Sequence, residues 1–160
     1  MICKERQDLI EKLGVHMEMK SNLAPVAARI LAYMFLKGKS GTTFDELVND
    51  LSASKSTVST HLSHLSDLNK VQYFTKPGDR KKYYVINKNG IIQSFNEMIS
   101  TWNSELELHQ EIMDYKDMMN DKSDVEVHYD LDFHKDYIQF LQEAIKAIST
   151  IKTKIINKNL

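Results

Sequence analysis

Glycine, proline and cysteine are scarce in this sequence, which narrows the kinds of protein it can form. Five glycines and two prolines among 160 residues leave few turn positions, so long regular elements are expected. The single cysteine, Cys3, cannot form a disulfide within the chain, which fits a reducing compartment. The longest apolar run, residues 30–36, is far too short for a membrane span, and the first residues lack a signal-peptide core. We therefore expect a soluble, cytoplasmic protein.

The short motifs of common enzyme classes are absent as well. The sequence has no glycine-rich phosphate loop, no Gly-x-Ser-x-Gly and no His-Glu-x-x-His. Histidines and aspartates are present, but no pattern places a nucleophile beside a base. These absences favour a protein that is not an enzyme and that needs no cofactor.

Charge is close to balanced overall but is segregated along the chain. The formal net charge is -1. Residues 70–88 carry six lysines and arginines against Asp79 alone, a net charge of +5. Residues 105–136 carry eleven carboxylates against three lysines, a net charge of -8. One face of the protein could therefore approach phosphates while another stays away from them.

The first quarter of the chain predicts two helices. Apolar residues spaced four apart favour a helix over residues 5–20. Pro25 suits the first turn of a second helix, because the N–H that proline lacks would be unpaired there. That second helix, residues 26–36, is apolar on nearly every side, so we expect it to be the central buried element.

A helix pair with a tight turn is predicted next. Thr43 and Glu46 have the spacing of a capping box ahead of a short helix over residues 44–51. A three-residue turn follows, and its last residue, Ser54, is a good cap for a helix that should reach about Asn69. Two segments rich in β-branched and aromatic residues come after it, joined by Pro-Gly-Asp, which predicts a β-hairpin with a basic tip.

These parts, in this order, are those of a winged helix-turn-helix. The second helix of the pair begins with small or flexible donors, which suit a major groove about 12 Å wide. Basic side chains at the hairpin tip can reach phosphates, and an arginine there can reach the minor groove. The residues expected to contact duplex DNA are Ser54, Lys55, Ser56, Thr57, Thr60, His61, Lys76, Arg80, Lys81 and Lys82.

The second half of the chain predicts two long helices. From Gly90 onward, apolar residues are separated alternately by three and four, a spacing that usually faces another helix. His109 occupies the same row, and we expect a packed or hydrogen-bonded histidine whose protonation would disturb a dimer. The expected dimer seam is Ile92, Phe95, Ile99, Trp102, Leu106 and Met113. A final helix is expected over residues 133–155, with Tyr137, Leu141, Ala144, Ile148, Ile151 and Ile155 on its inner face.

Four stretches of residues 8–86 make the chain resemble the MarR family of bacterial regulators, and specifically its choline-responsive GbsR-type branch. They are LAPVAARI at residues 23–30, TFDEL at 43–47, SKSTVS at 54–59 and KPGDRKKY at 76–83. The resemblance implies a homodimer built from the N- and C-terminal helices, with two winged domains on a roughly palindromic operator. It also implies that residues 54–57 read the DNA and that Arg80 lies at the wing tip.

The sequence as a whole predicts a mainly α fold with a small β-hairpin. A winged helix-turn-helix domain is expected at residues 23–88, between dimerisation helices at residues 1–22 and 89–160. The expected function is sequence-specific regulation of transcription, with the dimer acting as a repressor by occupying a promoter. The alternative is a helical scaffold protein that uses the winged helix for protein contacts.

A pocket for a small-molecule effector is a further expectation. Aromatic side chains could bind a quaternary ammonium group through cation–π contacts, although aromatic residues at helical spacing are more often plain core. The residues expected to line it are His16, Tyr33, Phe35, Met98 and Trp102.

Two other features could suggest redox sensing or metal binding, but neither is expected to have that role. Cys3 lies near a chain end that should fray, so an inert thiol is expected rather than a redox sensor. Carboxylates and histidines alternate with apolar residues between Asp124 and His134, but alternation spreads ligands along a strand instead of around one point. We therefore expect no metal site. Residues 121–132 are expected to form an acidic connection, and the role of the acidic, histidine-containing segment 121–136 is undetermined.

Replacing Trp102 by aspartate tests the seam. If the row from Ile92 to Met113 joins two subunits, Trp102→Asp should convert the dimer to a monomer, because a charge cannot be buried unpaired. Light scattering after size exclusion gives the mass directly. A dimer that survives the substitution would place this row inside one subunit.

Overall fold

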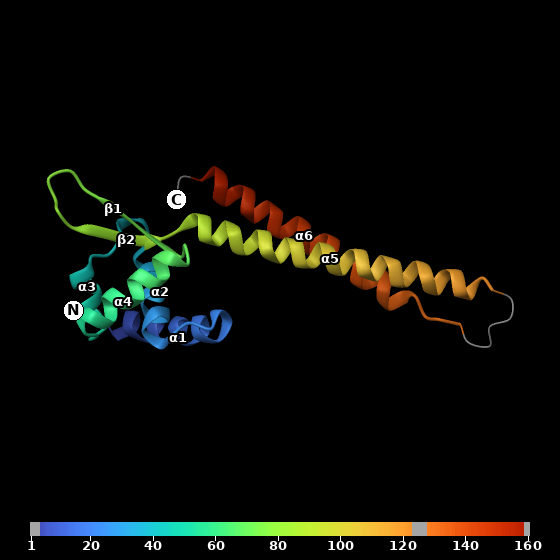
Figure 1. The fold of residues 1–160 in the computed structure, drawn as a ribbon, viewed down its shortest axis with the longest axis horizontal. Helices are drawn as coiled ribbons and strands as arrows, with labels where there is room; N and C mark the ends of the chain where they lie inside the picture. The colour runs from blue at the N-terminus through green and yellow to red at the C-terminus, as the bar shows by residue number, and fades with distance from the viewer. Residues whose placement is uncertain (1–3, 123–127, 159–160) are drawn as a thin grey trace. The chain divides into compact units, whose positions relative to one another are not determined.

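The computed structural model describes residues 4–122 and 128–158 and forms two compact units, residues 1–91 and 92–160. The first unit contains α1 (Lys4–Ser21), α2 (Pro25–Lys37), a short 3-10 helix η1 (Gly38–Ser40), α3 (Phe44–Asp50), α4 (Lys55–Asp67), β1 (Val71–Thr75) and β2 (Lys82–Ile86) (Figure 1). Helix α5 (Lys88–Asn120) begins in the last residues of the first unit. Most of α5 forms the second unit together with α6 (Asp132–Asn157). Over the described residues, no helix combines the length and apolar composition that crossing a membrane requires.

Helix α2 is the centre of the first unit, as its apolar sequence predicts. Seven of its thirteen residues are buried, and α1, α4 and β2 all pack against it. Its one arginine, Arg29, ties it to α1 through Glu18 and through Glu11, whose carboxylate lies 3.0 Å from the guanidinium. Gly14 of α1 is buried beside the Arg29 side chain, so the two helices approach closely.

Helices α3 and α4 form the predicted pair, and both predicted caps are confirmed. Thr43 and Glu46 make both hydrogen bonds of the capping box, and the Ser54 hydroxyl accepts the N–H of Thr57. Hydrogen bonds from Lys37, from the Thr43 N–H and from Thr42 outweigh the desolvation of Glu46 and lower its pKa to about 2. The two helices are slightly shorter than predicted, because α3 ends at Asp50 and α4 at Asp67.

The wing is the predicted antiparallel hairpin, with one addition that the sequence did not reveal. Strand β1 pairs with β2 from Val71 opposite Ile86 to Thr75 opposite Lys82. Thr42, which is fully buried, extends this sheet by exchanging two backbone hydrogen bonds of 2.9 and 2.7 Å with Tyr84. The wing is therefore anchored to the residue that precedes the cap of α3.

In the second unit, α5 and α6 lie side by side over much of their length (Figure 1). Polar contacts join them from the Lys152–Asn96 hydrogen bond of 3.0 Å, through the Tyr137–Glu105 hydrogen bond of 2.9 Å, to the contacts of His134 with His109 and Lys116. Among the described residues of this unit, those that are buried belong to α6, namely His134, Ile138, Leu141 and Ile148. The six residues of the expected seam are all half-buried.

The prediction that Ile151 lies on the inner face of α6 is wrong. Ile151 is 50% exposed, whereas Leu141 and Ile148 are buried as predicted. A single partner helix covers only a narrow stripe, and the buried residues of α6 are those at positions 134, 138, 141 and 148. Ile151 lies next to that stripe instead of on it.

Two glycines provide a matched test of the packing in the first unit. A methyl group at Gly90 would overlap the backbone carbonyl oxygen of Asn69, which cannot move aside. At Gly14 it would meet only the Arg29 side chain, 3.2 Å away, and alanine favours the helix by about 1 kcal/mol. Gly90→Ala should therefore cost about 1–3 kcal/mol in urea unfolding, more than Gly14→Ala. Equal costs would contradict the close contact at Gly90.

Candidate nucleic-acid interface

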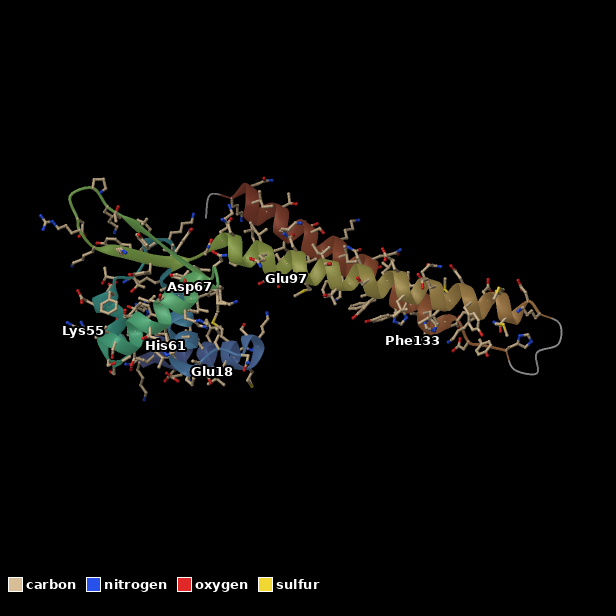
Figure 2. The ribbon with its side chains drawn as sticks, in the orientation of Figure 1. Glu18, Lys55, His61, Asp67, Glu97 and Phe133 are labelled. Atoms are coloured by element: carbon tan, nitrogen blue, oxygen red, sulfur yellow. The ribbon has the colours of Figure 1, made fainter. Side chains whose placement is uncertain are left out.

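The first turns of α4 present small polar side chains to solvent. Ser54, Lys55, Ser56 and Thr60 are exposed, and Thr57 and His61 are half-buried. In Figure 2, Lys55 lies at one end of α4 and Asp67 at the other, with His61 between them. The Ser54 hydroxyl lies 3.0 Å from that of Ser56 and 2.7 Å from that of Thr57. This network orders the end of the helix where N–H groups are unpaired, a place suited to an anion.

The wing tip is shaped by Asp79. Its carboxylate accepts the N–H of Lys81 at 2.9 Å and the hydroxyl of Tyr83 at 2.6 Å, and its own N–H donates to the Lys76 carbonyl at 3.0 Å. The Tyr83 hydrogen bond, followed by that of Lys81, holds the pKa of Asp79 below its usual value. Asp79 is thus an ionised turn residue, and it fixes the backbone on both sides of Arg80.

Aromatic rings hold two of the wing lysines in place. The Lys76 ammonium lies 3.8 Å from the centre of the Tyr83 ring, and the Lys82 ammonium lies 4.2 Å from that of Tyr73. Tyr83 in turn stacks on Phe74, with ring centres 5.6 Å apart. Such contacts pre-order cations without neutralising them.

Arg80 differs from these lysines. Its side chain is exposed, and it makes no hydrogen bond, ion pair or ring contact within the described part of the chain. The guanidinium at the tip is therefore available to an external acceptor. Lys81 and Lys82 are exposed beside it, so the four predicted cations of the wing all reach solvent.

The wing and α4 form one surface. A cavity of about 220 Å³ lies between them, lined on the α4 side by Ser59, Ser63 and Ser66 and on the wing side by Tyr73, Lys82 and Tyr84, with Phe44 and Leu62 completing it. No motif in the sequence predicted a role for these serines or tyrosines. Their signal was the spacing of the serines, four and three residues apart, which places them on one face of a helix.

The comparisons agree with this architecture. Residues 25–73, from α2 into β1, match the sequence profile of bacterial regulatory proteins of the arsR family. The chain has a winged helix-turn-helix fold. No functionally curated protein matches the chain significantly.

Two solved structures are similar to most of this chain. The crystal structure of a transcriptional regulator is 16% identical, with a TM-score of 0.52, and the match covers 96% of this chain and 99% of that one. A mutant of MepR from S. aureus is 21% identical, with a TM-score of 0.43 and coverage of 71% and 89%. The first of these likenesses extends the shared fold beyond the winged domain to the flanking helices.

The residues expected to line an effector pocket lie in different settings. Tyr33 is a core residue, and its hydroxyl donates to Asp50 at 2.6 Å. Burial, together with Asp50, raises the pKa of Tyr33 to about 12. Phe35 and His16 are exposed, and Met98 and Trp102 are half-buried in the second unit. A cavity of about 570 Å³ beside α1, α2 and the α3–α4 turn is lined by other residues, so the expected pocket stays a prediction.

Cys3 and residues 124–127 lie outside the described residues. His134 belongs to α6, as predicted, and this helix begins at Asp132, one residue before the expected start at Phe133. Among the residues that the structure describes, no three histidine, cysteine or carboxylate side chains are grouped as a metal site would require.

Removing the Tyr83 hydroxyl tests the structure of the wing tip. In Tyr83→Phe the pKa of Asp79 should rise toward 3.8, because its main stabilising hydrogen bond is lost. A carboxyl-detected NMR titration measures this pKa directly. Tyr73→Phe is the matched control, since its ring also lies beside a lysine but its hydroxyl does not contact Asp79. An unchanged pKa in Tyr83→Phe would contradict the hydrogen bond.

Proposed function

We propose that this protein is a transcriptional regulator that binds duplex DNA as a homodimer. The observation that carries the proposal is the surface shared by the start of α4 and the basic wing. Both belong to the first unit, and their predicted contact residues are exposed or half-buried. The match of residues 25–73 to a regulatory family supports the same conclusion.

In this mechanism α4 lies in the major groove and the wing follows the adjacent backbone. Ser56 and Thr60 can pair with base edges, while Lys55 and the ordered N-terminus of α4 bind phosphate. Lys76 and Lys82, already held on aromatic rings, contact phosphates without much further ordering. Arg80 enters the minor groove, where a narrow A·T-rich segment attracts a guanidinium.

Dimerisation is assigned to the helices outside the winged domain. Helix α5 extends over 33 residues without burying one, and the second unit exposes large apolar side chains. A monomer rarely leaves so much apolar surface in contact with water. The side chains concerned are Leu108, Tyr115, Met118, Phe133, Phe140, Ile151 and Ile156, each at least half exposed.

A dimer would present two α4 helices about 34 Å apart on one face of a roughly palindromic operator. Occupying a promoter in this way blocks polymerase, so we propose a repressor. Membership of the MarR family and its GbsR-type branch, and control by a small-molecule effector, are finer parts of this proposal and rest on the sequence resemblance. An effector would act by binding one spacing of the two wings better than another.

A helical scaffold is the second candidate, and the exposed apolar residues of α5 and α6 favour it. The two functions separate in a fluorescence-anisotropy titration. Tight binding to duplex from the protein's own upstream region, steep in salt and weaker for a scrambled duplex, would support the regulator. Absence of binding even at low salt would exclude it and favour the scaffold.

Two substitutions of Arg80 distinguish the contribution of its charge to DNA binding from that of its planar guanidinium. Arg80→Ala should weaken binding to the native duplex about tenfold and reduce any preference for A·T pairs beside the half-sites. Arg80→Lys should restore part of the affinity but not the preference, because lysine keeps the charge without the planar guanidinium. Anisotropy titrations with A·T- and G·C-flanked duplexes measure both quantities. Unchanged affinity and preference in Arg80→Ala would remove this residue from the interface.

A further inference from the structure

A buried histidine joins the two helices of the second unit. His134, near the start of α6, is 7% exposed, and both of its ring nitrogens are hydrogen-bonded to α5. Nδ1 lies 2.9 Å from Nδ1 of His109, and Nε2 lies 2.9 Å from the ammonium of Lys116. Phe133 and Tyr137 flank the pair, with ring centres 6.0 and 4.6 Å from that of His109. Phe133 marks this end of α6 in Figure 2.

The three partners allow only one arrangement of protons. Lys116 is an ammonium and can only donate, so Nε2 of His134 must accept. Nδ1 of a neutral His134 then carries the proton and donates to Nδ1 of His109, which must accept in turn. Both histidines are therefore neutral when both hydrogen bonds are made. A proton added to either ring puts two donors against each other and a second positive charge near Lys116.

We propose that the His109–His134–Lys116 relay is an acid-sensitive lock that holds the start of α6 against α5 only while both histidines are neutral. The charged and titratable groups that face it are Glu105, His109 and Lys116 on α5, Asp130 ahead of α6, and Tyr137 on α6. Glu105 is occupied by the Tyr137 hydroxyl, so Asp130 is the carboxylate that opposes the effect.

The direction of the pH effect follows from the environment of His134. Desolvation, then Lys116 and His109, lower its pKa below 6.5, and the attraction of Asp130 only partly offsets them. The unfolded chain therefore takes up the proton first, so stability falls as pH drops through 6.5 toward the folded pKa. Above pH 6.5 both states are neutral at this site, and the relay is intact.

Hydrogen exchange of the intact protein tests the lock. Between pH 7.5 and 5.5, protection of the amides of residues 133–141, corrected for intrinsic rates, should fall by up to about tenfold, because pH 5.5 lies one unit below the ordinary histidine pKa of 6.5 that His134 regains when α6 detaches. His134→Gln can accept from Lys116 but cannot be protonated, so its protection should change by less than about twofold. His128→Gln, at an exposed histidine outside the helices, is the control and should behave as the wild type. Equal losses in the wild type and His134→Gln would overturn the lock.

A second variant keeps the test decisive should His134→Gln fold poorly. Lys116→Met removes the ammonium but keeps the length of the side chain, so the pKa of His134 should move up toward 6.5. Ring-nitrogen NMR shifts report that pKa in both proteins. A wild-type pKa at or above 6.5, or no rise in Lys116→Met, would overturn the proposal.

A consequence for DNA binding rests on the proposed function, in which the second unit forms the dimer. DNA affinity should then fall with acid in the wild type more than in His134→Gln. The two proposals fail differently. No DNA binding at pH 7.5 would exclude the regulator and leave the lock standing, whereas unchanged exchange on acidification would exclude the lock and leave DNA binding standing.

Discussion

The burial of α2 positions every candidate DNA contact, directly or through one neighbour. Most of its apolar side chains need to be removed from water, and α1, α4 and β2 cover them. Covering α2 directs Val58, Leu62 and Leu65 of α4 inward. Because a helix has a fixed period, the same packing directs Ser56 and Thr60 outward. The polar face of α4 is thus a consequence of the hydrophobic core.

The wing places several positive charges close together at the tip of a small hairpin. Like charges in close proximity repel, and long side chains lose entropy when they bind. The hairpin reduces the second cost by placing Lys76 and Lys82 over tyrosine rings. Asp79 supplies the one negative charge, which fixes the turn through Tyr83 and Lys81. Arg80 remains available as the side chain for the partner.

The second unit is stabilised in another way. The core around α2 is apolar, whereas the contacts between α5 and α6 include hydrogen-bonded polar groups. Of these groups, His134 is buried. Polar layers of this kind specify one pairing of helices, but they depend on protonation. The apolar core of the first unit carries no such dependence, so the two units should respond differently to acid.

Local chemistry in the sequence determined the helices, the caps and the hairpin to within a few residues. The Thr43–Glu46 box, the Ser54 cap and the Pro-Gly-Asp turn act between neighbours in the chain, so their effect can be seen without the fold. The exposure of Ser56 and Thr60, two of the residues expected to contact DNA, followed from the helical periodicity of the sequence.

Contacts between distant residues were decided by the tertiary structure alone. Thr42 pairs with Tyr84 across 42 positions, and His109 pairs with His134 across 25. Nothing in the local sequence shows that His134 is buried while the carboxylates around it are not. Likewise, the sequence could not tell whether Tyr33 lines a pocket or belongs to the core, where its hydroxyl donates to Asp50. A sequence pattern fixes which side of a helix is apolar, but only packing decides which residue from elsewhere in the chain that side meets.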